Sequence, residues 1–198
     1  MALALFVAGC AAKPPDLEPV TMIAARSCDT RPALANAVAV APDPDKPANA
    51  LIDAQARCLD GAGGKALYAL FALPDGAPYT VSVSSVPMGR STFAPRAILL
   101  DSAGNVMREL PDGSFLFRGA NLTALFRAHP GERYMAVASD THLVGRPISR
   151  LQENTQVRGA AAGGFYFEIH TGSEQTHDST WSHNGQIVVA VTPDKKER

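Results

Sequence analysis

Residues 67–110 decide the fold of this chain. They contain Leu-Tyr-Ala-Leu-Phe-Ala-Leu-Pro-Asp-Gly at 67–76, Tyr-Thr-Val-Ser-Val-Ser-Ser-Val at 79–86 and Ala-Pro-Arg-Ala-Ile-Leu-Leu-Asp-Ser-Ala-Gly-Asn-Val at 94–106. In the middle run, Tyr79, Val81 and Val83 alternate with hydroxyl residues. Because successive side chains of a strand point to opposite faces, this alternation predicts a strand with one buried face. A second layer must cover that face, so the stretch predicts a β-rich domain.

Turn residues separate further apolar runs along the chain. The segment from Asp101 to Asn105 predicts a tight hairpin in which Gly104 takes a positive φ. The runs at 98–100 and 187–189 lack alternation, which predicts central strands that are buried on both faces. Together the patterns predict an all-β fold, an antiparallel β-sandwich of the jelly-roll or immunoglobulin-like kind. Its strands are expected at 67–73, 79–86, 96–101, 105–110, 114–118, 133–139, 165–171 and 186–192.

The rest of the chain divides by composition. A signal peptide is expected at 1–9, a polar tether at 10–19, a short irregular or helical preamble packed on the sheet at 20–64, the sandwich at 65–193 and a charged tail at 194–198. Residues 48–57 have a helix-compatible composition, and 121–128 are expected to form one or two helical turns. The polar stretches 147–164 and 172–185 are expected to be long connections.

Composition excludes some classes of partner. The 198 residues are 46% hydrophobic and 19% charged, an ordinary globular balance that allows one domain with a real core. The formal net charge is −1. A chain so close to neutral offers no electrostatic reason to bind nucleic acid.

The N-terminal residues 1–10, Met-Ala-Leu-Ala-Leu-Phe-Val-Ala-Gly-Cys, end in a small-residue pattern before Cys10. This pattern resembles the lipobox of bacterial lipoprotein signal peptides, in which the peptidase cuts before the cysteine and the thiol carries a diacylglycerol. The resemblance implies a protein anchored to the membrane through acylated Cys10. Residues 11 and 12 are alanines and lack the aspartate of an inner-membrane retention signal, so the outer membrane facing the periplasm is the expected site. A buried N-terminal strand or helix is the alternative interpretation.

Cys28 and Cys58 are the other two cysteines. Exported proteins favour pairing, so a structural disulfide that closes a loop of about 30 residues is expected, worth roughly 3.5 kcal/mol in the chain-entropy model. Two buried free thiols are the alternative. The spacing matches neither a zinc site nor a redox motif.

Candidate metal ligands are densest at His170, His177 and His183, with Asp178 beside one of them. A catalytic metal site uses three protein ligands placed by the fold, but these spacings match no metal motif. A solvated polar loop therefore explains them better, and neither a metal nor a cofactor is expected. Paired carboxylates for glycoside hydrolysis stay open, because that geometry is never local in sequence. No nucleophile elbow, dinucleotide motif or P-loop occurs.

Trp181 is the only tryptophan, and it lies among polar residues between the last two expected strands. A loop tryptophan in this setting suits stacking on a sugar ring or contact with a protein partner. Closing the end of the sandwich is the alternative role. We take Trp181, His177 and His183 as candidate ligand-binding residues and identify no catalytic residue.

The central block resembles the maltose-operon periplasmic protein (MalM-like) family, over roughly residues 67–146. The resemblance rests on Phe-Ala-Leu-Pro at 71–74, Tyr-Thr-Val-Ser-Val-Ser-Ser at 79–85, Thr-Phe-Ala-Pro at 92–95, Ala-Ile-Leu-Leu-Asp at 97–101 and Glu-Arg-Tyr at 132–134. It implies an exported, non-catalytic accessory protein connected with carbohydrate uptake, and it supplies no catalytic residues.

The leading interpretation is therefore a lipid-anchored periplasmic accessory or binding protein of the bacterial envelope, and not an enzyme. A glycan or another envelope protein is the expected partner. Two alternatives remain open. One is a cell-envelope hydrolase with dispersed carboxylates or a histidine-bound metal, and the other is a structural subunit of an envelope assembly.

Overall fold

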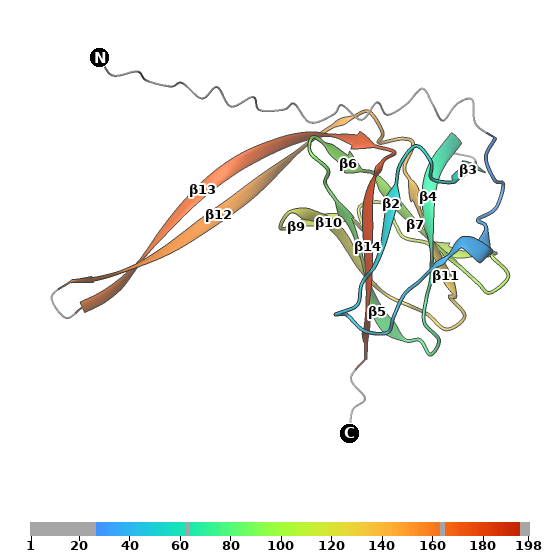
Figure 1. The fold of residues 1–198 in the computed structure, drawn as a ribbon, viewed down its shortest axis with the longest axis horizontal. Helices are drawn as coiled ribbons and strands as arrows, with labels where there is room; N and C mark the ends of the chain where they lie inside the picture. The colour runs from blue at the N-terminus through green and yellow to red at the C-terminus, as the bar shows by residue number, and fades with distance from the viewer. Residues whose placement is uncertain (1–26, 62–63, 163–164, 195–198) are drawn as a thin grey trace, which may run out of the picture.

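The computed structural model describes residues 27–61, 64–162 and 165–194, and over these ranges the regular structure of the protein consists mainly of β-strands (Figure 1). Two larger sheets pack face to face, and a third, three-stranded sheet carries a long projecting hairpin. The prediction of an all-β, sandwich-like fold is confirmed. The helical content of the described residues is the short 3-10 segment η1 (Leu34–Asn36), and none of their helices has the length and hydrophobicity to cross a membrane.

The first sheet has six strands. Its order is β1-β4-β11-β7-β8, with β3 paired to β4 beside this path. All its pairs are antiparallel except β1 with β4. Its strands are β1 (Val38–Ala39), β3 (Cys58–Gly61), β4 (Gly64–Ala72), β7 (Pro95–Leu100), β8 (Val106–Glu109) and β11 (Tyr134–Ser139).

The second sheet has five strands in the order β2-β14-β5-β10-β9, all antiparallel. Its edges are β2 and β9, so β9 lies at an open side of the sandwich, as β8 does in the first sheet. The strands are β2 (Ala48–Ile52), β5 (Tyr79–Val86), β9 (Leu116–Arg118), β10 (Asn121–Arg127) and β14 (Gly185–Pro193).

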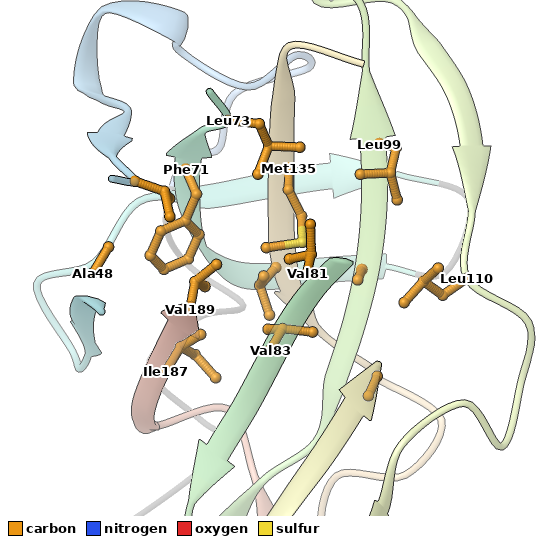
Figure 2. Close-up of a cluster of buried hydrophobic side chains, with 14 of the residues drawn as sticks. Ala48, Phe71, Leu73, Val81, Val83, Leu99, Leu110, Met135, Ile187 and Val189 are labelled. Carbon is orange, nitrogen blue, oxygen red and sulfur yellow. The ribbon is translucent and has the colours of Figure 1, made fainter. Parts of the chain in front are cut away.

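The main core lies between these two sheets (Figure 2). Phe71, Leu99 and Met135 come from the six-stranded sheet and meet Val83 and Val189 of the five-stranded sheet, and all five side chains are fully buried. Buried and half-buried residues alternate along the whole of β5, as the 79–86 pattern predicts. Because burying apolar area is the main favourable term in folding, this shared core holds the two sheets together.

A second cluster covers the outer face of the six-stranded sheet. Leu100 belongs to it, whereas its neighbour Leu99 belongs to the main core. The end of β7 is therefore buried on both faces, as the apolar run at 98–100 predicts, with Ile98 half-buried against the second cluster. The covering residues come from the N-terminal part of the chain, where Leu34, Ala37 and Leu59 pack against the cluster.

The same prediction is only partly correct for residues 187–189, because β14 is a central strand between β2 and β5 but is not fully buried on both faces. Ile187 and Val189 are fully buried, but Val188 between them is only half-buried. Leu34, Ala37 and Leu59 cover the other sheet, and within the described residues the outer face of β14 is partly accessible. An apolar run therefore shows that a strand is buried, but not on how many faces.

The third sheet corrects the expectation of long polar loops. Residues 147–164 and 172–185 mostly belong to β12 (Pro147–Ala162) and β13 (Phe165–Ser182), which pair antiparallel from Pro147↔Thr180 to Ala162↔Phe165. We call this hairpin the arm; it projects well beyond the sandwich in Figure 1. Its base is fixed by the parallel pairing of β13 with β6 (Ser91–Phe93). The strand expected at 165–171 is part of β13, and there Phe165, Phe167 and Ile169 alternate with more polar residues. The stretches 147–162 and 172–182 lack such alternation, so they give no local strand signal.

Two predicted helical stretches are also strands. Residues 121–128 contain β10, which pairs with β5 from Leu122↔Ser85 to Arg127↔Thr80, and 48–57 contain β2 followed by a turn. In both stretches pairing with a neighbouring strand overrides a weak local helix preference. The turn predictions are correct: Gly104 has φ 80° in the hairpin between β7 and β8.

Candidate functional site

A groove opens between the edge strands of the two sheets, at the base of the arm. The end of β8 and the beginning of β9 line it, together with the 110–113 turn, and its volume is about 1070 Å3. The 140–143 turn and the first residues of β12 form the opposite side. The groove thus lies along the lateral edge of the sandwich, beside the base of the arm.

Aromatic and aliphatic side chains make up much of the lining. They come from four separate segments of the chain, and they include Phe115, Leu116, Phe117, Leu143, Ile148 and Trp181. Leu116 is 57% exposed and Trp181 is half-buried, so part of this apolar surface is open to solvent. Such surface in a concave site is typical of places that bind small molecules or chain segments.

Trp181 is held in place through its backbone. Its N–H donates a hydrogen bond to the Arg146 carbonyl at 3.0 Å, and its carbonyl accepts one from the Gly145 N–H at 2.9 Å. Trp181 also pairs with Thr92 of β6, which runs parallel to β13. These contacts fix the tryptophan at the junction between the arm and the sandwich.

Charged groups lie on the same groove. Arg96 pairs with Glu109, with 2.7 Å between Nη2 and Oε2, and this hydrogen bond raises the pKa of the Arg96 guanidinium. Asp112 and Asp140 add two further carboxylates, and Asp140 Oδ1 accepts a hydrogen bond from the backbone N–H of His142 at 2.9 Å. The groove therefore combines apolar faces with anionic hydrogen-bond acceptors.

Arg150 connects the arm to the groove. Its guanidinium carbon lies 5.8 Å from the centroid of the Phe117 ring, within the range of a cation–π interaction, and Nη1 donates to the Ala120 carbonyl. Arg150 belongs to β12, whereas Phe117 belongs to the edge strand β9. This contact positions one aromatic side chain of the groove from the arm.

The predicted disulfide is confirmed. Cys28 and Cys58 are joined with an S–S distance of 2.04 Å and a Cα–Cα distance of 4.9 Å. It ties the beginning of the described chain to β3, and both cysteines pack with the main core. Cys10, the predicted lipidation site, lies outside the described residues.

The histidines differ in their surroundings. His177 is exposed on β13, next to Asp178, which accepts a hydrogen bond from Ser149 Oγ at 2.6 Å. His183 follows β13 and is only 5% exposed, with its Nδ1 2.6 Å from Ser139 Oγ. Burial lowers the pKa of His183. The part of the chain that the structure describes contains no group of three His, Cys, Asp or Glu placed to hold a metal ion.

Of the three candidate ligand-binding residues, only Trp181 lines the groove. The sequence does not single out the other lining residues, such as Phe117 and Asp112, because they are scattered over a turn and a short edge strand. Their nearest sequence signal is the Pro-Asp-Gly turn at 111–113, which marks a turn and says nothing of a ligand.

A comparison of the chain with family models, curated proteins and solved structures finds no match.

Proposed function

We propose that this protein is an exported, non-catalytic binding module of the cell envelope that holds a carbohydrate segment in the groove at the base of the arm. The observation that carries the proposal is the placement of Trp181 in a groove that also contains Asp112 and Asp140.

The chemistry of the lining suits a sugar. A pyranose ring presents an apolar face of C–H groups and a rim of hydroxyl groups, so it is best recognised by an aromatic face together with carboxylates that accept hydrogen bonds. Trp181 and Phe117 supply aromatic surface, and Asp112 and Asp140 supply acceptors. The volume of about 1070 Å3 lies near the upper end of ordinary ligand sites, which suits more than one sugar unit.

The cellular location belongs to the proposal as well. The disulfide between Cys28 and Cys58 supports an oxidising compartment. With the lipobox-like residues before Cys10, it supports a protein anchored by an N-terminal lipid at the periplasmic face of the outer membrane. The resemblance of residues 67–146 to the maltose-operon periplasmic family makes maltose-type oligosaccharides the first ligands to test.

Isothermal titration calorimetry with a series of maltooligosaccharides tests the proposal. We expect saturable binding that strengthens with chain length, and a loss of at least about tenfold in affinity in Asp112→Asn, which removes one charged acceptor. Leu125→Ala, an exposed apolar residue on β10 that does not line the groove, is the matched control. Absence of heat with every oligosaccharide, or equal affinity of Asp112→Asn and the wild type, would contradict the proposal.

Hydrolysis is the alternative that the same groove suggests, because it contains more than one carboxylate. A general acid and a second carboxylate on opposite sides of a glycosidic bond are what glycoside hydrolysis requires. Glu109 is paired with Arg96, so Asp112 and Asp140 are the candidates. Chromatography of the oligosaccharides after prolonged incubation distinguishes the two functions. Shortened products that disappear in Asp140→Asn would favour the hydrolase.

A further inference from the structure

The arm is a long two-stranded ribbon with little support from the rest of the protein. All 16 residues of β12 pair with β13, which at roughly 3.3 Å per residue is a length of about 50 Å. Only Thr180–Ser182, at the base of β13, pair with a further strand, β6. Along the rest of the arm, neither strand has another strand partner within the described residues.

Such a ribbon is not expected to be stable alone. An isolated two-stranded hairpin is marginal in water, and an open edge presents backbone N–H and C=O groups that can pair with another chain. Proteins usually block open edges with proline or with bulges. The pairing of β12 with β13 has no register shift, and the only proline in either strand is Pro147 at the base. Neither a proline nor a bulge therefore blocks these edges beyond the base of the arm, and their charged side chains decide what they can pair with.

Charge selects which edges pair. β12 contains two arginines and one glutamate, a net charge of +1, whereas β13 contains two glutamates, one aspartate and no lysine or arginine, a net charge of −3. Two β13 edges therefore repel each other strongly, and two β12 edges repel each other weakly. A β12 edge attracts a β13 edge, because opposite charges on adjacent strands stabilise a pair.

We propose that the arm is a self-assembly element through which copies of this chain associate head to tail, β12 of one copy pairing with β13 of the next. β12 and β13 of one arm run antiparallel. When two arms lie side by side and point in the same direction, β13 of one arm is therefore antiparallel to β12 of the next, and the two arms form one antiparallel sheet. Each contact then uses one edge of each copy and leaves the other edge for the next copy. Repetition of such a heterologous contact closes into a ring when the rotation between copies allows it. This inference is independent of the carbohydrate groove.

Sedimentation velocity of the full chain over about a hundredfold range of concentration tests it. We expect assemblies larger than a monomer at high concentration. Glu168→Lys/Glu174→Lys changes the charge of β13 from −3 to +1, so both edges become positive. In this variant we expect the assembly to weaken at least about tenfold.

Asp45→Lys/Asp60→Lys is the control, because it makes the same change in net charge at two exposed residues of the sandwich. It is expected to assemble like the wild type. Circular dichroism checks the folding of each variant. Should the arm variant fail to fold, Arg158→Glu tests the other edge, because it changes β12 from +1 to −1. A wild type that stays monomeric throughout, or an arm variant that assembles as tightly as the wild type, would overturn the proposal.

Discussion

At the scale of single residues, two positions have properties that follow directly from their neighbours. Gly185 begins β14 and is buried against Phe93 of β6, where the third sheet meets the sandwich. His183, two residues earlier, is buried beside Ser139. The sequence marks His183 only as a candidate ligand and does not mark Gly185, because the buried position of each depends on a contact with a distant part of the chain.

Gly185→Ala is expected to destabilise the protein by roughly 1–3 kcal/mol, since the added methyl group must be accommodated in a packed core. A Cβ at this position would lie 2.5 Å from Cβ of Phe93 and 3.4 Å from its Cα. Urea unfolding followed by circular dichroism measures the change. Gly172→Ala is the control, because a Cβ there meets nothing within 4 Å. Equal urea midpoints for Gly185→Ala and the wild type would show that a Cβ at residue 185 does not clash with Phe93.

His183 is expected to make stability depend on pH. Burial lowers its pKa in the folded protein below the ordinary value of 6.5, so below pH 6.5 the unfolded chain binds a proton that the folded chain does not. The stability is therefore complete above pH 6.5 and falls as the pH drops below it, by at most about 1.4 kcal/mol per pH unit from this residue.

Thermal or urea unfolding between about pH 5 and pH 7 measures this effect, above the range in which carboxylates dominate. In His183→Gln the free energy of unfolding should change less steeply with pH in this window. His177→Gln controls for the loss of an exposed histidine. If the free energy of unfolding of His183→Gln changes with pH as steeply as that of the wild type, the pH dependence has another origin.

At the scale of elements, an ion pair between half-buried Arg108 and buried Glu132 connects β8 to the turn before β11. Arg108 Nε lies 2.6 Å from Oε1 of Glu132, and Glu132 is 3% exposed. Oε2 of Glu132 also accepts a hydrogen bond from the His129 N–H at 2.9 Å, and the Arg108 guanidinium lies 5.4 Å from the centroid of the Phe126 ring. This carboxylate therefore depends on Arg108 for its counter-charge.

Arg108→Ala is expected to lower the free energy of unfolding by about 3–5 kcal/mol, because it leaves a buried carboxylate without its counter-charge. Arg96→Ala provides the comparison, since the Arg96 side chain is 44% exposed in its pair with Glu109, and such a pair is worth about 1 kcal/mol or less. Chemical denaturation of both variants measures the two losses of unfolding free energy. Similar losses of unfolding free energy in Arg108→Ala and Arg96→Ala would mean that the burial of Glu132 does not make its ion pair more important than the exposed one.

Elements were predictable from sequence where their signal is local. β5 has strict alternation, and the hairpin between β7 and β8 has Gly104 where a positive φ is required. Of the arm, only residues 165–171 carry a local strand signal. The rest of β12 and β13 was not predictable, because these strands pair with each other and their polar sequences lack alternation. The spacing of Leu122, Leu125 and Phe126 fits one face of a helix. In β10, which pairs with β5, Leu125 instead lies on the opposite face from the other two and is exposed.

At the scale of the whole molecule, the sandwich was predictable because its core needs only apolar strands in two layers. The groove was not, since it requires that the end of β8, the beginning of β9, the 140–143 turn and the arm meet at one place. Trp181 was the exception, because a single tryptophan among polar residues stands out in any sequence. Its role at the junction of arm and sandwich became apparent only from the topology.

The central claim, that this groove binds carbohydrate, is tested most directly by the fluorescence of Trp181. It is the only tryptophan in the chain and it lines the groove, so its emission reports on that site alone. Titration with maltooligosaccharides should give a saturable change in intensity or emission wavelength, as the half-buried indole exchanges water for a sugar face. An emission spectrum that stays constant up to saturating oligosaccharide, in a protein that is folded by circular dichroism, would contradict the account.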